Sequence, residues 1–254
     1  MLGAGCWVLG AGCWVLGAGC PGKLTKTQNP EPRTKNPESR TKYLKLYKRM
    51  METTKDEVRF LKTLSDPDKI QGFLDSIDYN SNYACRSPSW VIRKKSAHCF
   101  EGALFAAAAL QFIGYQPLIV DMTAYTDDDP VIAVFKEHGH WGAVAKSNFT
   151  TLRYREPVYR SLRELVMSYF DFYFNIAGDK SLRSYSLPLD LTIYNPMQWT
   201  TTDEDLEYIG DKLEKLRHYP VVDNRMINKL NKASDTMLRA GMLGSNEAGL
   251  FKPK

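Results

Sequence analysis

Residues 96–114 read S-A-H-C-F-E-G-A-L-F-A-A-A-A-L-Q-F-I-G, and this stretch decides the fold that we expect. The long run of alanine, leucine and phenylalanine predicts a buried helix that ends at Gly114. Cys99 stands at the start of that helix, where unpaired N–H groups and a partial positive charge favour a thiolate. Since the thiolate is the nucleophile, this position suits a cysteine hydrolase or acyltransferase. The plainer alternative is a small buried residue that packs at the helix start.

Capping signals on both sides of the Cys99 helix predict more helices. A side chain that accepts from an early N–H group, or a proline in the first turn, marks a helix start. Such starts are found at Thr54 with Glu57, at Asp66 before Pro67, and at Ser161 with Glu164. Two more helices are expected near residues 203–217 and 224–240.

Three apolar runs of strand length follow the Cys99 helix. They are residues 117–124, 131–135 and 141–145. The sequence K-E-H-G-H between the last two runs, with Gly139, predicts the turn of a β-hairpin. Helices, then antiparallel strands, then helices indicate an α+β domain.

Residues 1–42 differ in character from the rest of the chain. The first 22 residues repeat L-G-A-G-C-W-V, and residues 29–42 repeat N-P-E-P-R-T-K as N-P-E-S-R-T-K. Residues 21–42 are too polar to bury a core, so we expect a disordered, repeat-containing tail at 1–42 and one domain at 43–254. The apolar repeat lacks the positively charged start of a signal peptide, and we expect a cytoplasmic protein with no membrane partner.

The positive charge is concentrated in the tail. Of the net charge of +5, residues 1–42 carry +4, which leaves +1 for residues 43–254. A nearly neutral domain gives no reason to expect a nucleic-acid partner. Three of the five cysteines belong to the tail repeat, so only Cys85 and Cys99 remain. Two cysteines do not make a disulfide framework, which favours a reducing compartment.

We expect neither a metal nor a cofactor. The residues that come nearest to a zinc site are His98, Cys99, His138 and His140, but they lack the paired short spacings of structural zinc. The acidic triplet 127–129 lacks the glycine and the terminal glutamate of a calcium loop. The sequence also has no glycine-rich phosphate loop and no nucleotide fingerprint.

Four runs within residues 66–200 resemble a group of uncharacterised bacterial transglutaminase-like proteins of the papain-like cysteine superfamily. They are A-H-C-F-E-G-A-L-F-A-A-A-A-L, D-D-D, W-G-A-V-A-K-S-N-F and L-R-Y-R-E-P-V-Y-R-S-L-R-E-L. The resemblance implies a helix that carries the nucleophile and packs on an antiparallel sheet, with extra C-terminal helices. It implies that Cys99 is the nucleophile and that Asn148 orients the base. In the family a histidine begins the strand that reads V-I-A-V-F, whereas this chain has Pro130 there.

The expected hairpin also limits where a replacement base can lie. If the turn centres near Gly139, Pro130 lies across from Asn148 at the open end. His140, the fallback base, then lies at the turn end, about eight residues or roughly 25 Å away at ~3.3 Å per residue. A base must come within hydrogen-bond reach of the nucleophile, so His140 and Asn148 can hardly share one site. His218 is too distant along the chain for its spacing to place it.

Two functions from different classes follow. The first is a cysteine acyl hydrolase or acyltransferase that attacks an amide or ester through Cys99 and is impaired because Pro130 replaces the base. The second is a catalytically inactive relative that binds a peptide or protein in the same cleft. Cys99 with Asn148 favours the first, and Pro130 favours the second. Loss of a triad base typically lowers the rate by several orders of magnitude.

Overall fold

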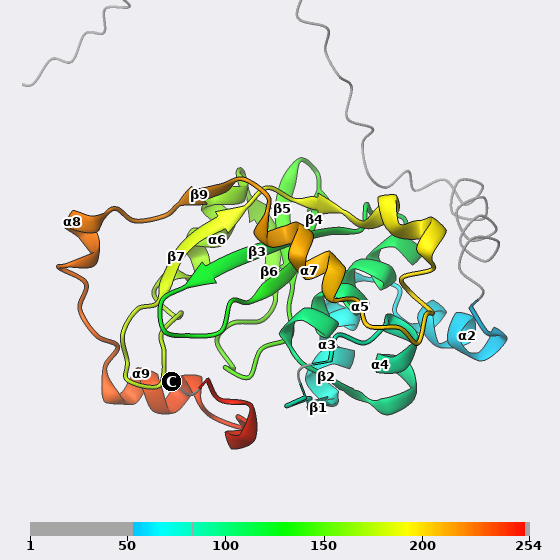
Figure 1. Ribbon diagram of the computed structural model, residues 1–254, viewed down its shortest axis with the longest axis horizontal. Helices are drawn as coiled ribbons and strands as arrows, with labels where there is room; N and C mark the ends of the chain where they lie inside the picture. Colours follow the sequence, from blue (N-terminus) through cyan, green and yellow to red (C-terminus); the bar gives the residue numbers. More distant parts are fainter. Residues whose placement is uncertain (1–52, 83, 252–254) are drawn as a thin grey trace, which may run out of the picture. The chain divides into compact units, whose positions relative to one another are not determined.

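The computed structural model of the chain describes residues 53–82 and 84–251. The expected tail at 1–42 and the expected domain start at residue 43 lie outside the described residues. Within them the fold is α+β, with helices gathered around an antiparallel sheet (Figure 1). This agrees with the fold class that the order of the sequence patterns predicts.

The described residues form one sheet of seven strands. The strands are β3 (Leu118–Ala124), β4 (Val131–Glu137), β5 (His140–Val144), β6 (Arg155–Tyr159), β7 (Leu182–Ser186), β8 (Leu189–Asp190) and β9 (His218–Pro220). Their order is β6-β5-β4-β3-β7-β9, and β8 also pairs with β3. All these pairings are antiparallel. A separate short parallel pair joins β1 (Asp78–Tyr79) to β2 (Ser96–Ala97).

The expected hairpin is formed by β4 and β5. Glu137 pairs with His140 next to the turn, and Ala133 pairs with Val144 farther along. The two turn residues, His138 and Gly139, both have positive φ, at 50° and 81°. Positive φ at both central positions is typical of the type I′ turn of a two-residue hairpin, and glycine adopts it without strain.

The helices of the described part differ from the expected ones in two places: the sequence patterns do not predict a helix at Pro88–Lys94, and the helices near the C-terminal end are divided differently. They are α2 (Lys55–Thr63), α3 (Pro67–Ser76), α4 (Pro88–Lys94), α5 (Cys99–Phe112), α6 (Leu162–Phe170), α7 (Glu207–Glu214), α8 (Asn224–Ile227) and α9 (Asp235–Gly241), with 3₁₀ helices η1 (Leu191–Met197) and η2 (Glu247–Gly249). A single helix over 224–240 was the wrong expectation. Asp223 caps α8 and Ser234 starts α9 as a new helix, because its hydroxyl accepts from the Met237 N–H.

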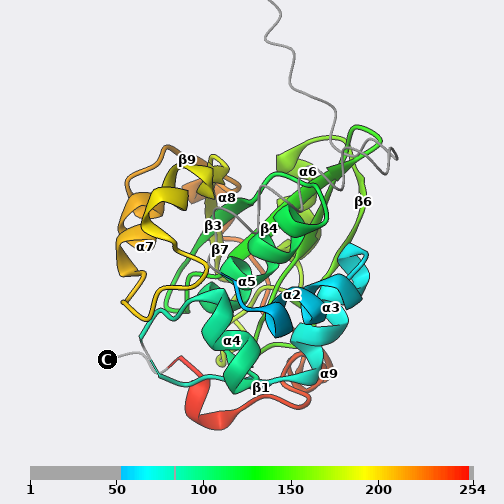
Figure 2. The same ribbon diagram turned by 90° about the vertical axis from the view of Figure 1, so that its right-hand side faces the viewer.

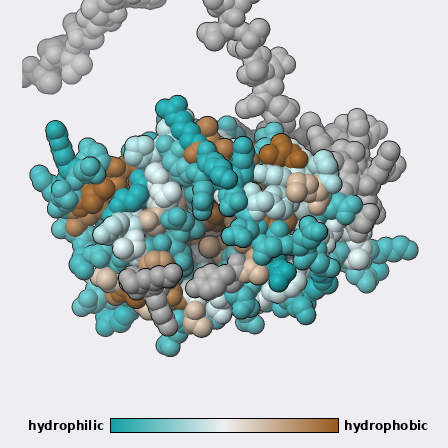
Figure 3. Space-filling view, in the orientation of Figure 1, coloured by the Kyte–Doolittle hydropathy of each residue, from teal (hydrophilic) through white to brown (hydrophobic). Residues whose placement is uncertain are grey.

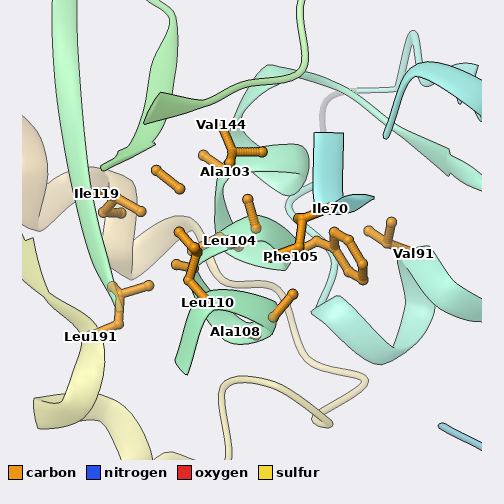
Figure 4. Packing of buried hydrophobic residues seen from close by; sticks show 14 of the residues in the cluster. Ile70, Val91, Ala103, Leu104, Phe105, Ala108, Leu110, Ile119, Val144 and Leu191 are labelled. Atoms are coloured by element: carbon orange, nitrogen blue, oxygen red, sulfur yellow. The ribbon is translucent and has the colours of Figure 1, made fainter. Parts of the chain in front are cut away.

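The alanine-rich helix α5 is buried, as its composition predicts. Every residue from Phe100 to Leu110 is buried, and α5 packs against β4, α3 and α4. Ile70 of α3 and Val91 of α4 lie on the Phe105 side of the helix, whereas Ile119 and Leu191 lie nearer Leu110 (Figure 4). Small alanine side chains let neighbouring elements approach α5 from several directions.

The sheet buries both of its faces. In β4, Val131, Ala133 and Phe135 belong to the hydrophobic cluster around α5, whereas Ile132 and Val134 belong to a second cluster that contains α6. This is the two-residue alternation of a strand between two layers. In Figure 2, α5 runs beside β4. The surface seen in Figure 3 is mainly hydrophilic, and its hydrophobic residues form small separate patches.

Candidate functional site

Cys99 lies in a narrow pocket between the first turn of α5, the β3–β4 loop, the segment after β5 and the C-terminal segment of the described chain. The pocket is lined by Tyr79, Cys99, Asp127, Asp128, Pro130, Ser147, Asn148, Phe149, Leu152, Tyr173, Ile176, Gly249, Leu250 and Phe251. The helix places Cys99 because His98 caps its N-terminus, with the ring Nδ1 accepting from the Phe100 N–H at 3.2 Å.

The structure brings together the three residues that the resemblance connects. Cys99, Pro130 and Asn148 all line this pocket. The Cys99 thiol faces the backbone N–H of Val131, the residue directly after Pro130. The β4–β5 register, continued past the pair of Ala133 with Val144, leaves Pro130 beside the segment that carries Asn148. Residue 130 therefore occupies the place next to Cys99 at which the resemblance implies a base.

None of the described side chains that line the pocket is a histidine. His140 is half-buried at the turn end of the hairpin, and its Nδ1 lies 3.0 Å from the His138 carbonyl oxygen. His98 uses its Nδ1 to cap α5. His218 is bound elsewhere in the sheet, with its Nε2 3.0 Å from Asp121 Oδ2. The fallback assignment of His140 as the base is therefore wrong. The strand register holds His140 at the turn end of β5, far from the Cys99 pocket.

The thiol of Cys99 is not activated by its place at the helix start. Burial raises its pKa from 9.0 to about 12, and the negative charge of Asp128 acts in the same direction. The backbone N–H groups of Phe100 and Val131 oppose the rise without cancelling it. The expectation that the helix terminus favours a thiolate was therefore wrong, because desolvation outweighs the helix dipole.

Two tyrosines and an acidic loop complete the polar surroundings. The hydroxyl of Tyr79 shares a hydrogen bond with the Cys99 side chain, and burial raises the Tyr79 pKa well above its usual range. The Tyr173 hydroxyl donates to the Asp128 carbonyl oxygen at 2.5 Å. The Asp127 carboxyl accepts from the Ser181 hydroxyl at 2.7 Å, and burial raises its pKa to about 6. A carboxylate of this kind is far too weak a base to deprotonate a thiol with a pKa near 12.

The side chain of Asn148 is fully engaged with the main chain of another segment. Its Nδ2 donates to the Asn246 carbonyl oxygen at 2.9 Å, and its Oδ1 accepts from the Asn246 N–H at 2.7 Å. Asn148 therefore orients a peptide unit here rather than an imidazole.

Sequence reasoning missed three parts of the pocket. Tyr79 lies in a two-residue strand without a periodic pattern. Tyr173 lies in the aromatic run Y-F-D-F-Y-F at 169–174, whose composition is typical of a packed helix face, and residues 249–251 lie about 100 positions beyond Asn148. Only the N-E-A-G sequence at 246–249, a short polar run with a glycine, marks the last segment as a turn.

In the part of the chain that the structure describes, no group of three His, Cys, Asp or Glu side chains is arranged to hold a metal ion. A membrane-spanning helix is likewise not found among the described residues, whose helices are too short or too polar for that. No protein-family model matches the chain, and no curated protein matches its sequence.

Proposed function

We propose that this chain is a transglutaminase-like domain of papain-like type that binds a peptide or protein partner in the Cys99 pocket without turnover. The observation that carries the proposal is Pro130, which lines the pocket beside the thiol where a base is required. Proline has no side-chain proton acceptor, and no described histidine lines this pocket in its stead.

The protonation of Cys99 supports binding over catalysis. With a pKa of about 12, only about one thiol in 10⁵ is ionised at pH 7, compared with a few per cent for a free cysteine. A nucleophile held as a neutral thiol, without a base to take its proton, does not attack an amide at a useful rate. The pocket nevertheless keeps a buried polar lining, which is suited to recognition.

A second candidate is the cysteine acyl enzyme that the resemblance implies. It is favoured by the backbone N–H groups of Phe100 and Val131, which both face the Cys99 sulfur. Donors at this position would stabilise the oxyanion of an acyl-transfer intermediate. This candidate requires a base that reaches the thiol.

The rate of Cys99 alkylation against pH separates the two candidates. For the binding module, the rate rises about tenfold per pH unit and reaches no plateau below pH 10, because the thiolate fraction limits it. Cys85 is the internal reference in the same sample, since burial raises its pKa to about 12 as well. A plateau near pH 6 for Cys99 alone would favour the enzyme and contradict the proposal.

Substitution of Pro130 tests whether the missing base is the reason why Cys99 stays protonated. We expect Pro130→His to raise the alkylation rate of Cys99 at pH 7 by at least tenfold, because an imidazole beside the thiol stabilises the thiolate. The matched control is Pro130→Gln, which changes the backbone and adds bulk without a comparable base. Equal rates in the two variants would mean that residue 130 is not the position of the base.

A further inference from the structure

The remaining wall of the Cys99 pocket is a segment of the chain itself. Residues 242–251, here called the strap, follow α9 and include η2. In Figure 2 this red segment lies close to β1, and the Asn246 side chain donates to the Tyr79 carbonyl oxygen of that strand at 3.3 Å. Gly249, Leu250 and Phe251 line the same pocket as Cys99. The strap therefore covers the pocket from the side of β1.

The strap is held mainly through its main chain. Asn148 forms a two-way hydrogen bond with the peptide groups of Asn246, and the Thr150 hydroxyl donates to the Leu243 carbonyl oxygen at 2.6 Å. A peptide from a partner offers the same N–H and C=O groups. Side-chain amides that pair with a peptide unit in both directions are a general means of binding polypeptide irrespective of its sequence.

One position of the strap accepts only one type of side chain. A Cβ added to Gly249 would lie 2.6 Å from the Tyr79 ring and 3.3 Å from the Asn148 Nδ2, so only glycine fits without displacement. The next residue, Leu250, packs against the second hydrophobic cluster, and Phe251 continues along the pocket. The site thus selects a glycine followed by bulky apolar residues.

We propose that the strap is an internal ligand: it occupies the cleft in place of a peptide that forms the same 3₁₀ turn, with the pattern Asn-x-x-Gly followed by two apolar residues, and such a peptide from a partner competes with it. This inference rests on the proposed binding function and names its ligand class and its regulation. Because the strap is tethered, its effective concentration is in the millimolar range, so a free peptide binds the closed protein weakly. If the strap is seated 99% of the time, the apparent affinity of the partner falls about 100-fold.

The test uses the full chain with Gly249→Ala, which unseats the strap by the clash with Tyr79. The probe is a fluorescein-labelled peptide, M-L-G-S-N-E-A-G-L-F, that copies residues 242–251. We expect at least tenfold tighter binding of the peptide to Gly249→Ala than to the wild type, and at least tenfold faster alkylation of Cys99 at pH 9. A probe peptide with alanine in place of its second glycine should bind neither protein.

Two controls guard against a general loss of structure. Gly72→Ala is the matched substitution, since a Cβ there meets nothing within 4 Å. It should leave peptide binding and Cys99 alkylation as in the wild type. Leu250→Ala loosens the strap by removing an apolar contact instead of adding a clash, and it should change both readouts in the same direction as Gly249→Ala but less.

The outcomes separate the two proposals. Equal peptide affinity for the wild type and Gly249→Ala would overturn the internal-ligand inference and leave the binding function standing. Faster alkylation of Cys99 in Gly249→Ala with no peptide binding to either protein would overturn the binding function itself. Unchanged alkylation and unchanged affinity in both strap variants would show that the strap does not cover the cleft.

Discussion

At the scale of single residues, two opposing effects on the Cys99 pKa, the helix N-terminus and burial, can be compared by their magnitudes. A helix N-terminus stabilises a nearby negative charge by about 0.3–1 kcal/mol when exposed and up to about 2 kcal/mol when partly buried. The rise of the Cys99 pKa from 9.0 to about 12 corresponds to about 4 kcal/mol against the thiolate. Burial therefore outweighs the helix N-terminus. The position of Cys99 in the sequence could not reveal this burial, because Asp128 and Tyr79 come from other segments of the chain.

Lys146 makes a residue-scale prediction about alkaline pH. Its Nζ is buried and donates to the carbonyl oxygens of Leu74 and Ile77, both at 2.7 Å. Burial lowers its pKa from 10.5 to about 8, so the folded state binds this proton more weakly than the unfolded state does. The free energy of unfolding should therefore rise from pH 8 to pH 10, by about 2 kcal/mol from this group.

The measurement compares urea unfolding of the wild type and of Lys146→Met at both pH values. The difference between the two proteins isolates Lys146 from the tyrosines, whose ionisation at high pH affects both proteins alike. We expect the wild type to gain about 2 kcal/mol relative to Lys146→Met between pH 8 and pH 10. Parallel pH dependence of the two proteins would mean that Lys146 titrates in the folded state as it does in water.

At the scale of elements, the start of α5 depends on one buried carboxylate. Glu101 is completely buried and accepts from the His98 N–H at 3.0 Å, the Asn80 Nδ2 at 2.9 Å and the Arg86 N–H at 3.1 Å. It thus ties the first turn of α5 to the loop between β1 and α4. Each buried donor left without an acceptor costs about 1–3 kcal/mol.

We expect Glu101→Ala to lower the free energy of unfolding by about 3 kcal/mol or more, since three donors lose their acceptor. Glu101→Gln keeps the shape and one acceptor oxygen, and should lose less than half as much. Chemical denaturation of the two variants at pH 7 measures both losses. Equal stability of the alanine variant and the wild type would show that water replaces the carboxylate.

Sequence patterns predicted those elements that are local in the chain. The capping box of Thr54 with Glu57 is present in the structure, and the β4–β5 hairpin follows from alternation and from Gly139. The hairpin pattern alone places Pro130 across from Asn148, and the resemblance connects both of them with Cys99. The position of the strap could not be predicted, since the hydrogen bonds between Asn148 and Asn246 span 98 residues and leave no periodic pattern in the sequence.

At the scale of the whole described domain, the strand β3 joins the two hydrophobic clusters. Ile119 belongs to the cluster around α5, whereas Val120 and Met122 belong to the cluster with α6. Between them the buried Asp121 reaches across β7 to His218 of the edge strand β9. This pair fixes the β7–β9 edge to the centre of the sheet.

Both ring nitrogens of His218 face an oxygen atom. His218 Nε2 faces the Asp121 carboxylate at 3.0 Å, and its Nδ1 faces the Leu216 carbonyl oxygen at 2.9 Å. The imidazole thus joins the Asp121 side chain to the main chain just before β9. Removing one member of such a buried pair leaves a charge without a partner, which costs about 3–5 kcal/mol.

A double-mutant cycle tests this link. We expect His218→Leu to lower the free energy of unfolding at pH 7 by about 3 kcal/mol, because Asp121 stays buried without its partner. The double variant Asp121→Leu with His218→Leu should recover at least 1 kcal/mol of that loss, since an apolar pair of similar volume carries no desolvation cost. Because β3 is shared by both clusters, the loss should be the same whether unfolding is followed by far-UV or by near-UV circular dichroism. Losses that simply add in the double variant would mean that the two residues contribute independently and that β9 is held by its backbone ladder alone.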